Sequence, residues 1–331
     1  MILVNAIKII FLLGFLIFIH EGGHFLAAKL FKVKVEDFSI GFGPKIFTKK
    51  GKETEYSISA IPFGGYIKMA GEFEKNDEPG SFNNAKVLHR ILIVAAGPMI
   101  NIIFGILVFF ILSVFSGYNL STTVSEIIPN ANPTGIEIGD KILEINGEKI
   151  RIKSDITDAV NKSNGEKIKV LVNRNGENIE LEVMPTEYNG MYILGIQVAL
   201  ASGNFKERIY YGFWETVDFS LSIGESLKML FTGNIGIEQM TGPIGISNIV
   251  AQTSGIYDFI YLLSLISLSL GVTNLLPIPA LDGGRIVLLI LEGIRGKALK
   301  EEIELGIQSL GFAVLILFSL YVSYNDILRI F

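Results

Sequence analysis

Four long apolar stretches divide the chain, and each is long enough to cross the hydrocarbon core of a bilayer. They cover residues 2–31, 91–115, 259–281 and 305–324. A membrane-spanning helix needs about 20 predominantly apolar residues, and the last three stretches contain no charged side chain. One such stretch alone could be a buried core helix. Four of them, separated by polar segments, predict a multi-pass α-helical membrane protein with four transmembrane helices.

The first stretch differs from the other three because polar residues interrupt it, among them Lys8, Lys29 and a cluster at residues 20–24. It lacks a basic segment before its apolar run and an Ala-x-Ala-like cleavage site after it. We therefore interpret it as a retained span rather than a secretory signal.

Composition agrees with a membrane protein and excludes several other classes. Hydrophobic residues make up 50% of the chain and charged residues 18%, whereas an average soluble domain is about 25% charged. The net charge of −5 leaves no basic surplus for phosphates, so nucleic acid is not an expected partner. Membrane lipid is an expected partner because of the four apolar stretches. The chain has no cysteine, which excludes disulfides, thiolate metal sites and cysteine nucleophiles.

Lysine and arginine near the ends of the apolar stretches predict their orientation. Basic residues gather in 32–90 and 282–304, whereas residues 116–140 and 229–258 have none. Cytosolic loops carry the excess of basic residues. The first two segments are therefore expected in the cytosol, with both termini and residues 116–258 on the other side.

Three segments between the spans have patterns of their own. Residues 32–70 alternate polar and apolar positions around Lys50-Gly51-Lys52 and predict a β-hairpin sheet at the cytosolic membrane face, with an ordinary structured loop as the alternative. Residues 206–231 are too charged to span and predict an interfacial amphipathic helix with Trp214 at headgroup depth.

Residues 121–200 predict a small α+β domain. Strand-like runs at 167–173 and 178–184 flank the turn signal Asn175-Gly176, a helix is expected at 154–161, and residues 139–147 read Gly-Asp-Lys-Ile-Leu-Glu-Ile-Asn-Gly. This order resembles a PDZ domain, a fold that binds an extended peptide along a sheet edge. A domain that only occludes or spaces is the alternative.

The cluster inside the first span carries the candidate chemistry. His20 and His24 are four residues apart and share one helix face, so both can bind one Zn²⁺ while Glu21 lies beside the metal and takes a proton from its water. The alternative is a polar helix end packed against a partner. Ionisable groups within a span are costly, which favours the functional interpretation.

A third ligand is expected because catalytic zinc usually has three protein ligands and an open position. His89 is expected in a polar loop beside Arg90 and is interpreted as a surface residue. Asp282 is the better candidate because Pro277 and Pro279 precede it. Prolines free backbone carbonyls, and irregular backbone at membrane depth is tolerated where it lines a protein-enclosed site.

The two motifs are expected at a similar depth. Lys29 lies five residues beyond His24, so the histidine pair is close to the cytosolic interface, as is Asp282 at the end of its span. The alternative for Asp282 is a solvated residue at a helix end. On the second span, Asn101 either packs against a neighbouring helix, which we favour, or supports the site by helping to bind the substrate or the oxyanion.

These motifs together resemble the site-2 proteases, intramembrane zinc metalloproteases, and specifically the bacterial regulator of sigma-E protease type with one PDZ domain. The matching segments span nearly the whole chain in family order: His20 to His24, Gly41-Phe42-Gly43-Pro44, Gly97-Pro98-Met99-Ile100-Asn101, Thr241-Gly242-Pro243-Ile244-Gly245-Ile246, and Asn274 to Gly284. Some relatives carry two tandem PDZ domains, whereas residues 121–200 have room for one.

The resemblance implies His20, His24 and Asp282 as Zn²⁺ ligands and Glu21 as general base and acid. It further implies that Asn274 helps to hold the substrate or the developing oxyanion. The implied substrates are single-pass transmembrane proteins already trimmed outside, such as anti-sigma factors, or remnant signal peptides, in the bacterial cytoplasmic (inner) membrane. The PDZ-like domain would bind new peptide ends or exclude untrimmed ectodomains.

The expected organisation is therefore a four-span membrane protein with a membrane-associated β-hairpin sheet and an inserted PDZ-like α+β domain. In chain order its parts are the first span with the zinc motif (1–31), the hairpin region (32–90), the second span (91–118), the PDZ-like domain (119–202), an amphipathic helix and connecting segment (203–255), the third span with the third ligand (256–284), a cytosolic loop or helix (285–304), and the fourth span and tail (305–331).

Two other functions compete with this interpretation. A non-catalytic membrane scaffold that gathers partners through the PDZ-like domain predicts no metal and an expendable Glu21. A metalloprotease with its site in the cytosol predicts a Glu ligand on a later helix and no prolines beside Asp282.

Overall fold

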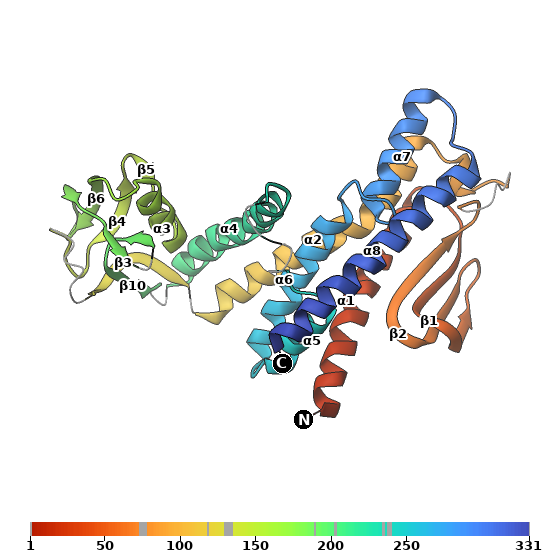
Figure 1. Cartoon of the computed structure of the whole chain (residues 1–331), viewed down its shortest axis with the longest axis horizontal. Coiled ribbons are helices and arrows are strands. Elements are labelled where there is room, and N and C mark those ends of the chain that lie inside the picture. The colour runs from red at the N-terminus through yellow and green to blue at the C-terminus, as the bar shows by residue number, and fades with distance from the viewer. Residues whose placement is uncertain are drawn as a thin grey trace. The chain divides into compact units, whose positions relative to one another are not determined.

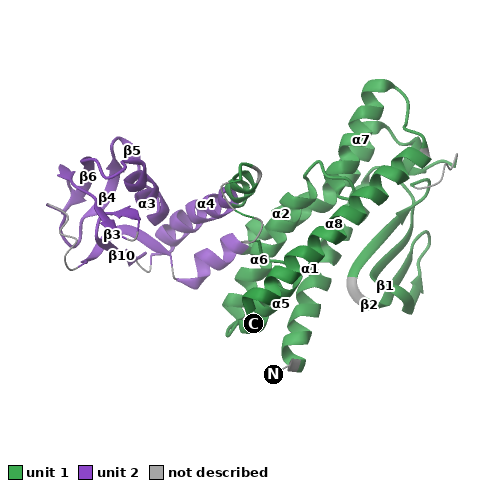
Figure 2. Cartoon of the chain, viewed as in Figure 1, with its two compact units in different colours: residues 1–108, 223–331 green, residues 109–222 purple. Residues whose placement is uncertain are grey.

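The computed structural model describes residues 2–72, 78–117, 119–128, 135–188, 190–201, 204–233, 236 and 240–330. The chain forms two compact units (Figures 1 and 2), one made of residues 1–108 and 223–331 and the other of residues 109–222. Each unit has its own hydrophobic clusters.

Four helices are long and apolar enough to cross a membrane: α1 (Ile2–Leu30), α2 (Val87–Ser116), α6 (Ile256–Asn274) and α8 (Glu301–Ile330). The long helices of the first unit gather in one bundle (Figure 1). Large apolar side chains such as Leu26 and Leu317 remain more than 60% exposed, as expected where lipid rather than water surrounds the helices. The prediction of four helices long and apolar enough to span is confirmed.

Small residues let these helices approach one another closely. A side chain added at Gly23 of α1 would lie 2.5 Å from the Ala96 carbonyl oxygen of α2. One added at Gly271 of α6 would lie 2.6 Å from the Pro98 carbonyl oxygen. Glycine therefore permits α2 to contact both neighbours, the close packing expected of helices in a membrane.

The third span is shorter than the predicted stretch 259–281. Helix α6 ends at Asn274, and a separate helix α7 (Asp282–Arg295) begins after an irregular segment. Pro277 and Pro279 cannot donate backbone hydrogen bonds, and Ala280 adopts a left-handed φ of 72°. Asp282 is consequently the first residue of α7 rather than the end of a spanning helix.

A short helix, α5 (Pro243–Gln252), lies between α1 and α8 with a charged side chain at each end. Asp326 of α8 is buried and accepts the Gly245 N–H at 2.8 Å at the start of α5. Lys8 of α1 donates to the Thr253 carbonyl oxygen at 2.9 Å at its end. An anion at a helix N-terminus and a cation at its C-terminus are both stabilising, which accounts for the lysine that interrupts the first span.

The hairpin region forms two long antiparallel strands, β1 (Val35–Lys50) and β2 (Glu55–Met69), in agreement with the predicted hairpin. Glycines with positive φ, Gly41 at 89° and Gly64 at 117°, occur within them. Residues 35–40 pair both with residues 65–69 and with residues 55–58. The 3₁₀ turn η1 (Phe82–Asn84) then leads towards α2.

The second unit contains a six-stranded sheet of order β10-β3-β4-β6-β7, with β5 paired to β4, and a separate β8–β9 hairpin. Its elements are β3 (Leu120–Ile127), β4 (Lys141–Ile145), β5 (Glu148–Lys149), α3 (Lys153–Lys162), β6 (Ile168–Arg174), β7 (Glu177–Val183), β8 (Thr186–Tyr188), β9 (Met191–Ile193) and β10 (Ile196–Leu200).

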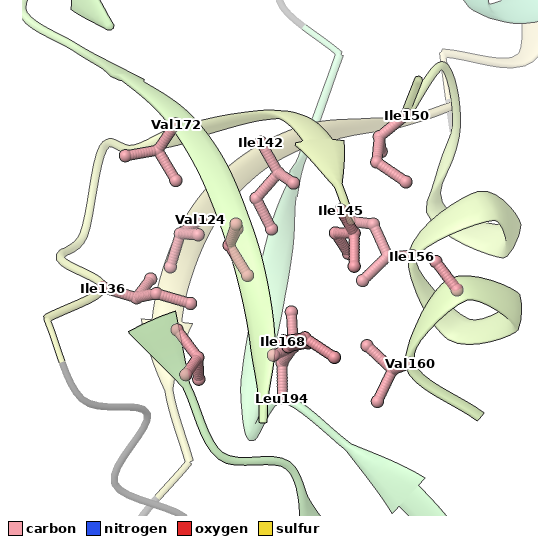
Figure 3. Close-up of a cluster of buried hydrophobic side chains, with 13 residues drawn as sticks. Val124, Ile136, Ile142, Ile145, Ile150, Ile156, Val160, Ile168, Val172 and Leu194 are labelled. Atoms are coloured by element: carbon pink, nitrogen blue, oxygen red, sulfur yellow. The ribbon is translucent and has the colours of Figure 1, made fainter. Parts of the chain in front are cut away.

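The predicted strands and helix of this unit are present, and β6 and β7 meet at the Asn175-Gly176 turn. Side chains of α3 and of the sheet form one core (Figure 3), in which Ile142 and Val170 are fully buried. Asp140, also fully buried, receives two hydrogen bonds from Arg174. The guanidinium lowers the pKa of this carboxyl group below its ordinary value.

Helix α4 (Phe205–Phe231) matches the predicted amphipathic helix. The Arg151 guanidinium lies over the ring of Trp214, 4.2 Å from the centroid. The headgroup depth of Trp214 stays a prediction.

Candidate metal centre

The histidine pair lies on one face of α1 and points into the first unit. His20 and His24 are each only 9% exposed, and their Nε2 atoms are 3.3 Å apart. The Nδ1 atom of His24 lies 2.9 Å from the Ile93 carbonyl oxygen of α2. A carbonyl can only accept, so this nitrogen carries a proton, and the neutral form of the ring presents its lone pair at Nε2.

Asp282 completes the cluster. Its Oδ2 atom is 3.1 Å from Nε2 of His20, and its Oδ1 atom is 3.6 Å from Nε2 of His24. An ion about 2.0–2.1 Å from each ligand atom in a tetrahedral arrangement spaces those atoms about 3.3 Å apart. The three separations lie around this value, so the residues fit a shared divalent cation that would relieve the repulsion between their lone pairs.

Glycine on α2 makes room for the second histidine. A side chain added at Gly97 would lie 2.3 Å from Nε2 of His24. The sequence motif Ala95-Ala96-Gly97-Pro98 indicated close helix packing, but it gave no sign that the imidazole itself occupies the space.

Glu21 lies next to the histidine pair and close to the sheet. A side chain added at Gly65 of β2 would meet Ile17 at 3.0 Å and the Glu21 Cγ atom at 3.4 Å. Strand β2 therefore passes directly against the turn of α1 that carries this carboxylate, so a peptide lying along β2 at this point would be close to Glu21.

Helix α7 is fastened beside the cluster by a buried ion pair. Arg285, one turn after Asp282, pairs with Glu72, whose side chain is 5% exposed. The other oxygen of Glu72 accepts the Met69 N–H at 2.9 Å, at the end of β2. This pair links the helix that begins with the third candidate ligand to the sheet that borders Glu21.

A second ion pair holds the other half of α7. Glu292 accepts two hydrogen bonds from Arg90 of α2, at 2.5 and 3.1 Å. The Arg285 and Arg90 guanidinium groups both lie over the Phe82 ring, 4.9 and 5.9 Å from its centroid. The residues of both pairs line a cavity of about 510 Å³ that also borders Asp282. We call these two ion pairs and Phe82 the α7 clamp.

The remaining predicted site residues have different surroundings. Asn101 is fully buried, and its side chain lies 3.3 Å from Nδ1 of His20, so it contacts the cluster as well as packing. Asn274 is the half-buried last residue of α6; among the described residues no hydrogen bond joins it to the cluster. His89 lies in α2, not in a loop, and stacks on Phe31 with ring centroids 4.5 Å apart.

The fold and the cluster describe a protein with four helices long enough to cross a membrane and with two histidines and one aspartate placed so that they could hold one cation. The model of Peptidase family M50 matches residues 8–318, and the chain belongs to this family, the site-2 proteases. As a member of this family, the protein is a metallopeptidase.

Relatives match over nearly their full length. A protein of Clostridium acetobutylicum named as a zinc metalloprotease is 38% identical over 330 residues, covering 98% of this chain and 97% of the relative. The regulator of sigma-W protease RasP of Bacillus subtilis is 30% identical over 417 positions, covering 99% of each. The zinc metalloprotease RasP of Shouchella clausii is 30% identical and covers 96% and 97%.

Replacing Gly97 with alanine should displace His24 and weaken metal binding about tenfold to hundredfold, because the added methyl group overlaps the imidazole. Metal content of the purified protein and competition with a chelator measure the change. The matched control is Gly22→Ala, where an added Cβ meets no heavy atom within 4 Å. Equal metal affinity in both variants would contradict the role given to Gly97.

The α7 clamp predicts a rescue by charge exchange. Removing one partner of a buried ion pair costs about 3–5 kcal/mol, so Arg285→Glu should loosen α7 and lower metal affinity. The double variant Glu72→Arg with Arg285→Glu should recover much of the loss. The control Arg295→Glu, at an exposed position on the same helix, should change little. A double variant no better than the single one would show that the pair does not position α7.

Proposed function

We propose that this protein is a zinc endopeptidase that hydrolyses peptide bonds within or near transmembrane segments of single-pass membrane proteins, with zinc held by His20, His24 and Asp282. The observation that carries the proposal is the convergence of the three side chains, with contacts of 3.1, 3.3 and 3.6 Å between their nitrogen and oxygen atoms in a largely buried cluster. Membership in Peptidase family M50 and the names of the relatives support the metal and the reaction class.

Zinc held by His20, His24 and Asp282 would supply Lewis-acid polarisation, which lowers the pKa of a water molecule at the site toward neutrality. The Glu21 carboxylate accepts the proton of this water and then delivers it to the nitrogen of the leaving amine. Asn274 holds the substrate backbone or the developing oxyanion with its carboxamide. By fixing the metal, His20, His24 and Asp282 hold the attacking water and the scissile peptide bond beside the Glu21 carboxylate.

A helical substrate hides its amides in its own hydrogen bonds, so it must unwind before cleavage. Residues 65–69 of β2 pair with residues 35–40 on one side only, among the described residues, and they run past Glu21. In our proposal the unwound segment adds to this edge as a further strand, which fixes its backbone beside the metal.

The substrate class follows from a site at membrane depth. The proposed substrates are anti-sigma factor-like proteins or remnant signal peptides after trimming of their ectodomains, and the name of the Bacillus subtilis relative, regulator of sigma-W protease, supports the former.

The sheet unit acts as a PDZ-like domain in this proposal. A groove of about 160 Å³ lies between α3 and β10 and is lined by Ile156, Val160, Leu194 and Val198, among others. Such a groove suits an extended peptide end. The domain either binds new ends there or excludes bulky untrimmed ectodomains.

A non-catalytic scaffold is the competing function. A scaffold does not need three converging side chains that could hold a metal, nor the Glu21 carboxylate beside a strand. A zinc protease needs both.

Replacing Glu21 with glutamine tests the reaction. The variant should lose cleavage of a reporter transmembrane segment by more than about a hundredfold while retaining zinc, because the amide cannot accept the proton. Asp282→Asn is the companion variant and should lose zinc affinity. Full activity of Glu21→Gln would reject the protease, and cuts mapped outside the membrane segment would reject intramembrane cleavage.

Orientation in the bacterial cytoplasmic membrane is tested by thiol labelling, since the chain has no cysteine of its own. The positive-inside rule places residues 116–258 and both termini outside and residues 32–90 and 282–304 in the cytosol. A membrane-impermeant maleimide should label Glu177→Cys in intact cells, and Lys297→Cys only after permeabilisation; both positions are exposed. The reverse pattern would overturn this topology.

A further inference from the structure

Asn101 has two unexplained features in its surroundings. Its side chain is fully buried on α2, and its Nδ2 atom lies 3.3 Å from Nδ1 of His20. Its Oδ1 atom, also buried, has no hydrogen-bond partner among the described residues. A buried acceptor without a donor is costly and calls for an explanation.

The chemistry of a histidine ligand supplies one. A neutral imidazole that offers its Nε2 lone pair to a cation must carry its proton on Nδ1. For His20, that N–H would face the amino group of Asn101, which is also a donor. Two donors cannot bond to each other, so this arrangement leaves both the His20 proton and the Asn101 oxygen unsatisfied.

A half-turn of the carboxamide changes this. The amide oxygen and amino group have nearly the same shape, so they exchange places within the same space. The oxygen then accepts the Nδ1–H of His20. The corresponding proton of His24 already has an acceptor on the same helix, the Ile93 carbonyl oxygen at 2.9 Å.

We propose that Asn101 is a positioning residue whose Oδ1 accepts the Nδ1–H of His20 and thereby locks the tautomer that presents Nε2 to the metal. Helix α2 then orients both imidazoles, one through a main-chain carbonyl and one through a side-chain carbonyl. This inference rests on the zinc site of the proposed function and gives Asn101 a role apart from substrate or oxyanion binding.

The position of Asn101 is itself supported from α6. The Ser267 hydroxyl group, fully buried, donates to the Asn101 main-chain carbonyl oxygen at 2.9 Å. This bond involves the main chain of Asn101 and not its side chain. Substitution of Ser267 therefore removes the main-chain bond without removing the side-chain contact with His20.

The test measures zinc affinity of the purified full-length protein by competition with a chelator, alongside its thermal unfolding. Asn101→Leu keeps the volume and removes the acceptor, and it should weaken zinc binding about tenfold to hundredfold. Asn101→Asp supplies a stronger acceptor for the same N–H and should bind zinc within a few-fold of the original chain. Ser267→Ala is the packing control and should leave zinc affinity nearly unchanged.

The aspartate variant decides between the two orientations even if the leucine variant fails to fold. If Asn101 instead donates to His20 through its amino group, Nδ1 of His20 carries a lone pair, and the carboxylate of Asn101→Asp would repel it. A loss of zinc in this variant would therefore overturn the inference. Unchanged affinity in Asn101→Leu would also overturn it. Failure of the proposed function is a different result: the original chain would then bind no zinc, or Glu21→Gln would still cleave.

Discussion

The structure depends on one constraint: two imidazole nitrogens and the two oxygens of one carboxylate converge in a largely buried cluster, with contacts of 3.1, 3.3 and 3.6 Å between the three side chains. Such atoms repel one another unless a proton or a metal cation lies between them. Only two of the three residues are on the same helix, so the cluster exists only if α7 is brought to α1 and held there. Many contacts of the first unit hold α7 beside α1.

Helix α2 is the common support of this arrangement. It offers Gly97 as the space for one imidazole and the Ile93 carbonyl oxygen as its acceptor, and it contributes Arg90 to the α7 clamp. The clamp also includes Glu72 at the end of the sheet, so the same contacts that set the third ligand tie it to the strand beside Glu21. In the proposed function, these contacts would couple the position of the third metal ligand to the position of the substrate strand.

The sequence was sufficient for the elements with strong local signals. Four apolar stretches predicted the spans, the His20–His24 spacing predicted one helix face, and two prolines before Asp282 predicted an irregular segment at the site. Turn signals such as Asn175-Gly176 predicted the β6–β7 hairpin. These features are set by side-chain periodicity and backbone restrictions, which are local properties.

Other parts depended on contacts that are remote in sequence and could not be predicted. Glu72 and Arg285 are 213 positions apart, and nothing in either segment indicates the other. Asn101 was assigned mainly to packing because a single polar residue in a span suits many neighbours. The end of α6 at Asn274 was missed because the apolar run continues to Leu281, although its backbone turns away from the helix earlier.

The most direct test of the account is X-ray absorption at the zinc edge on the purified protein. The account predicts two imidazole nitrogens and oxygen ligands at about 2.0–2.2 Å, with one imidazole lost in His24→Ala. A zinc environment without imidazole, or a spectrum unchanged when either histidine is replaced, would contradict it.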